Sequence, residues 1–402
     1  MKRSTLLLVL LYLLPAITQA ETGLNYKYWQ DRIALSGILN VTGFAANHTP
    51  TTIGIIPSNI GSSPASSDLS VTLASVTANA KLADWLNALI TTSYQQTSPA
   101  FIRSPDGGGD TLFVDQAFLT FADTHKTPFY LIAGRRWVDF GGLDDSSYLE
   151  STTQLLTLMR QTLASLGIDW KGWNSSIYAF RGLNAAAQPN SNKVNNYGIN
   201  IEYLKKDNQF GYGIGAGYIS NLVSALYPGS TVANSSSLNG GNYHTAVSAL
   251  YLHAIFNWHN FDASVKYANA LNAFSVLDIP FTTNSGLSFR GAKPATWGFN
   301  AGYHFNIMHY STRFGLGYQG SAQSVALGKA SGSATQSVAG VYGTAFAIGM
   351  PRSRYYANYT IRLIKWADIG IEIAKDQGYI KSNGGTGRST LTGLLTVLTH
   401  IS

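Results

Sequence analysis

Apolar and polar residues alternate with a period of two along most of the chain from Ile33 onward. The clearest segment is 297–306, where Trp297, Phe299, Ala301 and Tyr303 alternate with polar residues and glycine. The same alternation recurs in segments 197–203, 210–218, 261–267, 313–319, 355–363 and 367–374. Successive side chains of a β-strand point to opposite faces, so the pattern predicts strands with one apolar face and one polar face.

The stretch 111–170 shows how these strands are connected. Segments 111–121 and 129–138 are predicted as the fourth and fifth strands, joined by the short polar turn 123–128. The chain then enters the long connection 139–161 and returns as a strand that includes 166–170. Strand, short turn, strand and long loop form a unit that repeats through the sequence.

Connection lengths alternate strictly between long and short. The long connections are 47–67, 97–110, 139–161, 183–194, 222–243, 271–293, 321–351 and 378–388. The short ones are 81–82, 123–128, 171–172, 206–208, 259–260, 307–308 and the region of Trp366. This count gives about sixteen strands, and short periplasmic turns with long outer loops are typical of outer-membrane barrels. The predicted fold is an all-β transmembrane antiparallel up-and-down β-barrel, whose closed sheet satisfies every backbone group in lipid.

Composition and the chain ends fit this fold. Lys2 and Arg3, the apolar run 6–14 and the small residues Thr18 and Ala20 predict a signal peptide over 1–20. Residues 21–32 are then a short periplasmic lead-in and 33–402 the barrel. Charged residues make up 12% of the chain, against about 25% in ordinary soluble domains. No later apolar run is long enough for a membrane helix, which needs about 20 residues.

Several other classes of protein are excluded by the residue inventory. Without cysteine, the chain has no disulfide or thiolate metal site. A formal charge of +7, with no Lys/Arg cluster interleaved with aromatics, argues against nucleic-acid binding. His253 and His304 lie in predicted strands, but no spacing singles out a nucleophile and a base. We therefore expect neither an enzyme nor a cofactor or metal.

The face predicted to line the lumen carries charges of both signs. These residues either pair across adjacent strands or line a permeation path that they make selective, and the two roles are compatible. They are Asp169, Glu202, Asp262, Lys266, Arg313, Arg362, Asp368 and Glu372.

The third long connection, 139–161, is the candidate constriction. It carries Asp144, Asp145 and Glu150, and its residues Leu155, Leu156, Met159 and Leu163 recur at near-helical spacing. In sixteen-stranded porins the third loop usually folds into the lumen, so by architectural analogy these acids are expected to face basic wall residues. Arg135 and Arg136 are adjacent in a predicted strand, so one of them points inward if the strand is regular, and the alternative places both at the aqueous rim.

Parts of the sequence resemble a known family. The stretches 114–121 (VDQAFLTF), 127–130 (TPFY), 134–141 (GRRWVDFG) and Gly167-Ile168 resemble outer-membrane siderophore porins typified by the legiobactin receptor. Segments 68–71 and 82–85 look like the second and third strands of that family. Two features differ: the helical periplasmic segment of many relatives is missing, and the last strand ends in His400-Ile401-Ser402 rather than an aromatic residue.

The resemblance implies a single sixteen-stranded barrel that takes up ferric siderophore without a plug domain. We therefore expect a porin-like channel in the bacterial outer membrane that passes small polar solutes, with ferric siderophore as the expected cargo. A general diffusion porin and a structural or adhesive surface protein are the alternatives. The expected partners are outer-membrane lipid and the solute, and a homo-oligomer is expected because porins of this size are often trimers.

Overall fold

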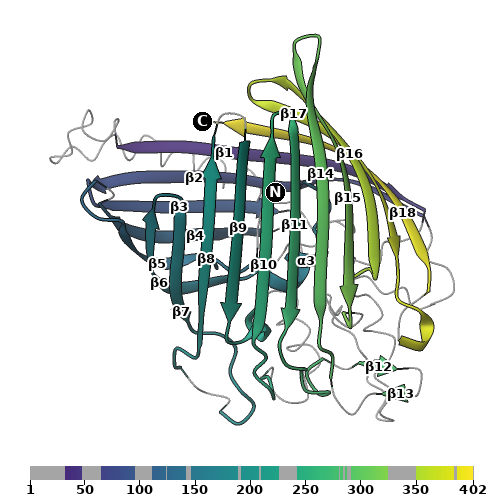
Figure 1. The fold of residues 1–402 in the computed structure, drawn as a ribbon, viewed down its shortest axis with the longest axis horizontal. Coiled ribbons are helices and arrows are strands. Elements are labelled where there is room, and N and C mark those ends of the chain that lie inside the picture. The colour runs from purple at the N-terminus through teal and green to yellow at the C-terminus, as the bar shows by residue number, and fades with distance from the viewer. Residues whose placement is uncertain are drawn as a thin grey trace, which may run out of the picture.

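Sixteen antiparallel strands form one closed barrel in the computed structural model (Figure 1). The structure describes residues 32–47, 65–95, 111–123, 125–141, 146–188, 192–207, 210–225, 242–279, 281–283, 286–287, 291–324, 350–383 and 387–401. The barrel strands are β1 (Ile33–Ala46), β2 (Ser66–Ala83), β3 (Leu86–Gln95), β4 (Thr111–Ala122), β5 (Phe129–Trp137), β6 (Arg160–Trp170), β7 (Trp173–Phe180), β8 (Asn196–Lys206), β9 (Phe210–Ile219), β10 (Ala249–Trp258), β11 (Phe261–Ala270), β14 (Ala295–Ile307), β15 (Tyr310–Ala322), β16 (Ser353–Ile364), β17 (Ala367–Gln377) and β18 (Ser389–Ile401). The predicted strand number is therefore confirmed.

Each strand pairs with its sequence neighbour, and the first strand closes the sheet on the last. The ladder between β1 and β18 runs from Gly37↔Ile401 to Ala46↔Thr392. In Figure 1, strands β8 to β11 run steeply across strands β1 to β4 of the opposite wall, as expected when strands tilt about 35–45° from the barrel axis. Closure leaves no unpaired sheet edge in the bilayer.

The short connections are tight turns at one end of the barrel, here called the short-turn end. Between β6 and β7, Lys171 and Gly172 have φ values of 49° and 89°, the conformation of a two-residue hairpin turn in which glycine is favoured. The predicted turn at 81–82 is wrong, because β2 continues to Ala83 and the turn is Asp84-Trp85. The ladder between β2 and β3 has a register shift between Lys81 and Ala83, where β2 extends beyond the predicted turn.

The long connections gather at the other end, the loop end, where β12 (Thr282–Thr283) and β13 (Gly286–Leu287) form a separate small hairpin (Figure 1). Among the described residues of these connections, three short segments are helical: α3 (Thr152–Thr157), η1 (Leu222–Ser224) and η4 (Lys381–Asn383). In the part of the chain described, no helix is long and apolar enough to cross a membrane.

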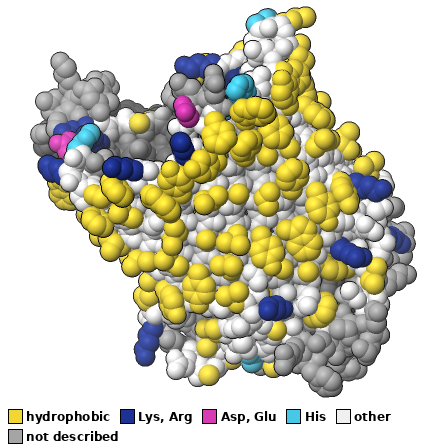
Figure 2. Space-filling view, in the orientation of Figure 1, with side chains coloured by type: hydrophobic (Ala, Val, Ile, Leu, Met, Phe, Trp, Pro, Cys, Tyr) yellow, Lys and Arg dark blue, Asp and Glu magenta, His cyan; other side chains and the backbone are white. Residues whose placement is uncertain are grey.

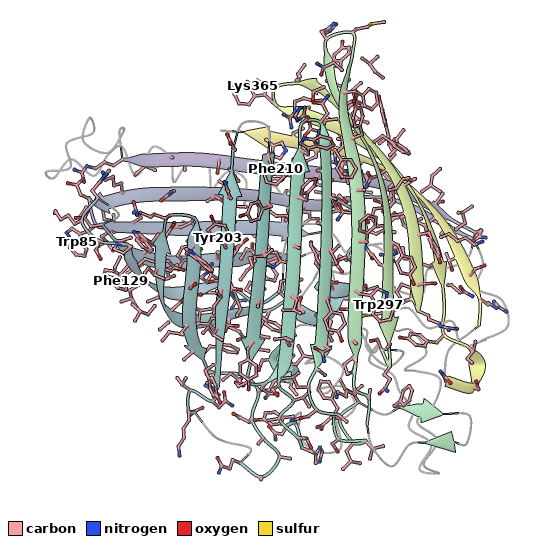
Figure 3. The ribbon with its side chains drawn as sticks, in the orientation of Figure 1. Trp85, Phe129, Tyr203, Phe210, Trp297 and Lys365 are labelled. Atoms are coloured by element: carbon pink, nitrogen blue, oxygen red, sulfur yellow. The ribbon has the colours of Figure 1, made fainter. Side chains whose placement is uncertain are left out.

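The outer face of the barrel is apolar. On β9, Phe210 and Ile214 are exposed whereas Gly211 and Gly213 are buried, and the same period appears on other strands. Figure 2 shows hydrophobic side chains spread over this face, with acidic ones only near one end. Aromatic residues ring the short-turn end, among them Trp85, Phe129 and Phe210 in Figure 3. An apolar belt with an aromatic girdle is the surface that a bilayer requires.

Candidate functional site: the barrel lumen

The loop that joins β5 to β6 crosses the interior of the barrel. Its residues 147–149 reach Glu372 on β17, which lies many strands away from β5 around the barrel. The Ser147 hydroxyl donates to Glu372 Oε1 at 2.9 Å. The backbone N–H groups of Tyr148 and Leu149 donate to the same carboxylate at 2.8 and 3.3 Å. The Tyr148 hydroxyl also lies 2.5 Å from Thr360 Oγ1 on β16. A fully buried carboxylate of the wall therefore holds the tip of this inward loop.

A capped helical turn, α3, continues the inward loop. Ser151 and Gln154 form a capping box: the Ser151 hydroxyl accepts from the Gln154 N–H at 3.1 Å, and the Gln154 side chain accepts from the Ser151 N–H at 3.0 Å. All six helical residues are buried. The helical spacing predicted from Leu155 to Leu163 holds only within α3, because Met159 follows the helix and Leu163 lies in β6.

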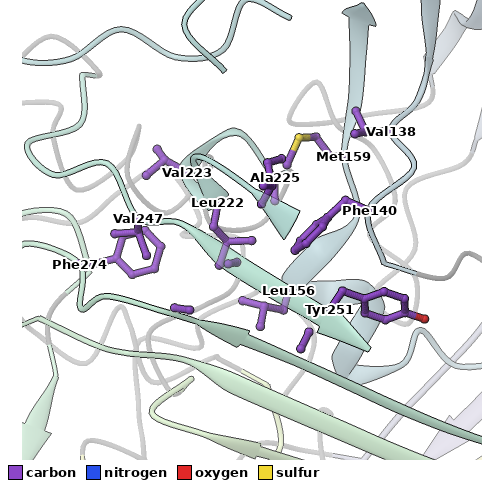
Figure 4. Close-up of a cluster of buried hydrophobic side chains, with 14 of the residues drawn as sticks. Val138, Phe140, Leu156, Met159, Leu222, Val223, Ala225, Val247, Tyr251 and Phe274 are labelled. Carbon is purple, nitrogen blue, oxygen red and sulfur yellow. The ribbon is translucent and has the colours of Figure 1, made fainter. Parts of the chain in front are cut away.

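The apolar side chains of the inward loop pack with other loop segments into one cluster inside the loop end of the barrel. Figure 4 shows Phe140 and Leu156 of the inward loop in one cluster with residues of other loops. These are Leu222, Val223, Ala225, Val247 and Phe274. The wall residues Ala249, Ala268 and Ala270 are small and buried in the same cluster. Burying this apolar surface stabilises the inward position of the loop, and part of the lumen is filled by protein.

A buried ion pair fixes the loop at a second point. The guanidinium of Arg354 on β16 binds the Asp376 carboxylate of β17 through two contacts, of 2.6 and 2.8 Å. Its remaining nitrogen, Nη1, donates to the backbone oxygen of Glu150 at 2.8 Å. The predicted loop acid Glu150 thus joins the loop to the wall through its carbonyl group. The other two predicted acids, Asp144 and Asp145, lie outside the described residues.

Below this loop, towards the short-turn end, a cavity of about 620 Å³ opens beside β8, β10, β11 and β14. Three predicted lumen residues, Glu202, Asp262 and Lys266, line it, and Asp139 lines it from the loop. The remaining polar lining consists of Ser146, Asn200, His253, Asn257, Ser264 and Asn300, with the phenol of Tyr251 among them. Val138, Ile255 and Ala263 line the same cavity, which therefore combines polar and apolar surface and is large enough for a small solute.

Charged side chains of the wall span an intervening strand by lying over glycine. Arg313 on β15 reaches Asp262 on β11 across β14, with contacts of 2.9 and 2.7 Å. It passes over Gly302, where an added Cβ would overlap the guanidinium. His253 on β10 likewise lies over Gly215 on β9, and its Nε2 is 3.3 Å from Glu202 Oε1 on β8. These bridges rest on glycines that leave room for flat side chains.

The adjacent arginines of β5 take different faces. Arg136 points inward: its Nη2 donates to Asp139 Oδ1 at 2.6 Å and its guanidinium lies over the Phe118 ring. Arg135 is four residues after the exposed Leu131, and the ladder between β5 and β6 has no register shift between them. The two side chains therefore lie on the same, outward face. The expectation that Arg135 lines the lumen is therefore wrong, because strand alternation sends only one of the two inward.

Burial raises the pKa of Asp139 above its ordinary value, and the charge of Glu202 adds to the rise. The Arg136 guanidinium and the Ser176 hydroxyl act in the opposite direction but do not cancel the effect of burial. Ser176 on β7 donates to Asp139 Oδ2 at 3.4 Å. Asp139 therefore sits at the root of the inward loop with its charged form less favoured than in water.

Three predicted charges, Asp169, Arg362 and Asp368, lie at the short-turn end, away from the cavity. Asp368 on β17 accepts from Arg362 on β16 at 2.8 and 3.3 Å, and His400 Nε2 is 3.9 Å from the same carboxylate. Asp169 is exposed near the turn that follows β6. These residues border the mouth of the barrel rather than the inward loop.

Several residues of the lumen were not among the predicted ones. Asp139, His253, Asn358, Arg354 and Asp376 all contribute to the cavity or to the loop anchor. Asn358 donates to the Ser146 backbone oxygen at 2.5 Å. Inner-face parity would have identified those in strands, since each alternates with exposed apolar neighbours.

The charged side chains of the lumen do not form a metal site in the part of the chain described. Nowhere in the described ranges do three or more His, Asp or Glu side chains gather so that they could hold a metal ion. The charged groups instead pair with one another across the wall.

A closed barrel of sixteen strands, apolar outside and polar inside, with a loop folded into the lumen, is an outer-membrane barrel of the porin class. Its fold is that of a channel. The chain is similar to several solved porins. The match to the anion-selective porin from Comamonas acidovorans covers 92% of this chain and 99% of that one, with a TM-score of 0.54 and 11% identity. The outer membrane channel DcaP of Acinetobacter baumannii gives the same TM-score with 9% identity, over 92% of this chain and 96% of that one. At these identities the likeness shows the fold alone.

Relatives by sequence have names that state no activity. The chain is 25% identical over 307 residues to a UPF0422 protein of Coxiella burnetii, covering 73% of this chain and 59% of that protein. A UPF0422 protein of Legionella pneumophila is 22% identical over 314 residues, which cover 75% of this chain and 52% of that protein. The chain thus spans little more than half the length of these relatives. No family model matches it.

Proposed function

We propose that this barrel is a channel through which small polar solutes cross the outer membrane, and that ferric siderophores are among them. The observation that carries the proposal is the cavity below the inward loop, whose charged lining residues are Asp139, Glu202, Asp262 and Lys266. Polar groups on a lumen wall replace part of the water that a solute loses on entry. The resemblance of segments 114–121 and 134–141 to siderophore porins supports the choice of cargo.

A general diffusion porin is the second candidate. It is favoured by the pairing of lumen charges, because Arg313 with Asp262 and Arg362 with Asp368 leave little net charge at either position. Such a wall would pass polar solutes of suitable size without binding one of them tightly. Oligomer formation belongs to the same proposal, since porins of this size often assemble as trimers.

Two measurements test the proposal. Single-channel recordings on the refolded barrel in planar bilayers should show stable conductance steps, and a structural or adhesive protein would give none. Uptake of ferric siderophore by a deletion strain should fall and recover on complementation. Unchanged uptake together with lost general solute permeability would leave the diffusion porin and remove the siderophore role.

A further inference from the structure

Three carboxylates line the lumen cavity, whereas the two arginines that pair with them are not among its lining residues. Asp139, Glu202 and Asp262 all line the cavity, but Arg136 and Arg313, which pair with two of these acids, do not. Lys266 also lines it, yet only 7% of this residue is exposed and its Nζ is buried. Three carboxylates and one buried ammonium group are therefore the charged groups that line this space.

Glu202 has the most available acceptor of the three acids. Its side chain is 33% exposed, against 26% for Asp139 and 21% for Asp262. Asp262 accepts from both Arg313 and His304, and Asp139 from Arg136 and Ser176. Glu202 receives only the His253 ring at Oε1, and its Oε2 makes no hydrogen bond to any described residue. A carboxylate can accept about four hydrogen bonds, so this oxygen has capacity for a solute donor.

The rest of the lining suits a solute that is rich in hydrogen-bond donors. Asn200, Asn257 and His253 line the same cavity as Glu202, and an amide oxygen or a neutral imidazole can accept a hydrogen bond. His253 lies over Gly215, and its imidazole reaches the Glu202 carboxylate there. The volume of about 620 Å³ accommodates an amino sugar or a compound of similar size.

We infer that the cavity around Glu202 is a selectivity site for donor-rich organic solutes that are cationic or neutral, and that it discriminates against polycarboxylates. The inference rests on the proposed channel function and narrows its cargo to solutes whose surfaces carry ammonium or hydroxyl groups. Glu202 is the specificity-determining residue, and it acts by ion pairing with an ammonium group or accepting a hydrogen bond from a hydroxyl group.

The test compares three probes of one ring size, glucosamine, glucose and glucuronate, as blockers of single-channel current at about pH 7, where the amine of glucosamine is mostly protonated and an ordinary histidine is mostly neutral. Glucosamine should reduce the current at concentrations about fivefold lower than glucose does, the ratio expected for one ion pair in contact in water. Glucuronate should be the weakest blocker. In Glu202→Gln the advantage of glucosamine should disappear, while Asp169→Asn, which changes an exposed acid outside the cavity, should retain it.

Current recordings count only inserted, open channels, so a folding defect in a variant does not obscure the result. Equal block by all three probes, or a glucosamine advantage that survives in Glu202→Gln, would overturn the inference and leave the channel. A refolded barrel without conductance steps would overturn the proposed function and the inference with it. A glucosamine advantage lost equally in Asp169→Asn would assign the effect to general lumen charge and also overturn the role of Glu202.

Discussion

Replacing Glu372 with alanine should release the inward loop from the barrel wall. The Glu372 carboxylate is fully buried on β17 and accepts three hydrogen bonds from loop residues 147–149. Hydrogen bonds to a charged acceptor contribute about 1.5–3 kcal/mol each, which sets an upper range of roughly 5–9 kcal/mol for the three. Because the freed loop donors regain water when the loop leaves the wall, we expect a loss of roughly 4–5 kcal/mol in loop docking.

The milder variant Ser147→Ala removes one of the three donors and should cost about 1.5–3 kcal/mol. The matched control is Asp368→Ala, which deletes another carboxylate of β17 that pairs with the exposed Arg362 side chain. An exposed ion pair contributes about 0–1 kcal/mol, so this variant should resemble the parent barrel.

Planar-bilayer recordings provide the assay. Glu372→Ala should give a larger mean conductance with added current noise, Ser147→Ala a smaller change, and Asp368→Ala neither. Retained mobility shifts on heating in detergent would show that all three barrels are folded. A folded Glu372→Ala barrel with the conductance and noise of the parent protein would refute the reasoning, since the loop would then not depend on this carboxylate or would not border the conduction path.

Three further predictions concern the wall and the root of the loop. Ile214→Arg, on the outward face of β9 where Ile214 is 55% exposed, should destabilise the barrel by about 2–4 kcal/mol in lipid vesicles, whereas Ser264→Arg in the lumen should not; equal losses in urea titrations would contradict the assigned faces. Gly302→Val would displace the Arg313 guanidinium and should cost about 1–3 kcal/mol from overpacking, so an unchanged urea midpoint would count against the bridge. Burial raises the pKa of Asp139 in the docked loop, so the docked loop binds a proton on this carboxyl group more tightly than a free loop does. Docking should therefore weaken as the pH rises just above the ordinary pKa of a carboxyl group. Current noise should increase over that interval in the parent barrel and not in Asp139→Asn, and noise that falls as the pH rises would contradict the sign.

The strands can be predicted from the sequence because each strand has one face towards lipid and the other towards the lumen, which makes apolar and polar residues alternate. The fourth strand, predicted over 111–121, is observed as Thr111–Ala122, and the fifth, predicted over 129–138, is Phe129–Trp137. One error lies at the predicted turn 81–82, because Lys81 and Leu82 belong to a strand that extends to Ala83. A barrel strand can extend beyond the apolar belt, and its polarity there resembles that of a turn.

The contacts of the site could not be predicted to the same extent. Parity placed Asp262 and Arg313 on the inner face, but their pairing across β14 depends on strand register and on the space above Gly302. The anchor between the inward loop and Glu372 joins residues more than 220 positions apart in sequence. Each of these carboxylates alternates with apolar neighbours in the same way, so sequence gives the face on which a charge lies and not its partner.

The inner-face residues of β10 and β11 show how far the loops extend into the barrel. On β11 the inward residues are Asp262, Ser264 and Lys266 near the short-turn end, and then Ala268 and Ala270 towards the loop end. On β10 the inner positions that belong to the buried apolar cluster, Ala249 and Tyr251, likewise lie at the loop end. A water-filled lumen would favour polar side chains along the whole strand, so the change to small buried residues marks where loop side chains replace water. The level of Lys266 is therefore the boundary between a packed upper lumen and a solvated lower one. In the proposed channel, a solute that passes along this wall would meet its first charged groups there.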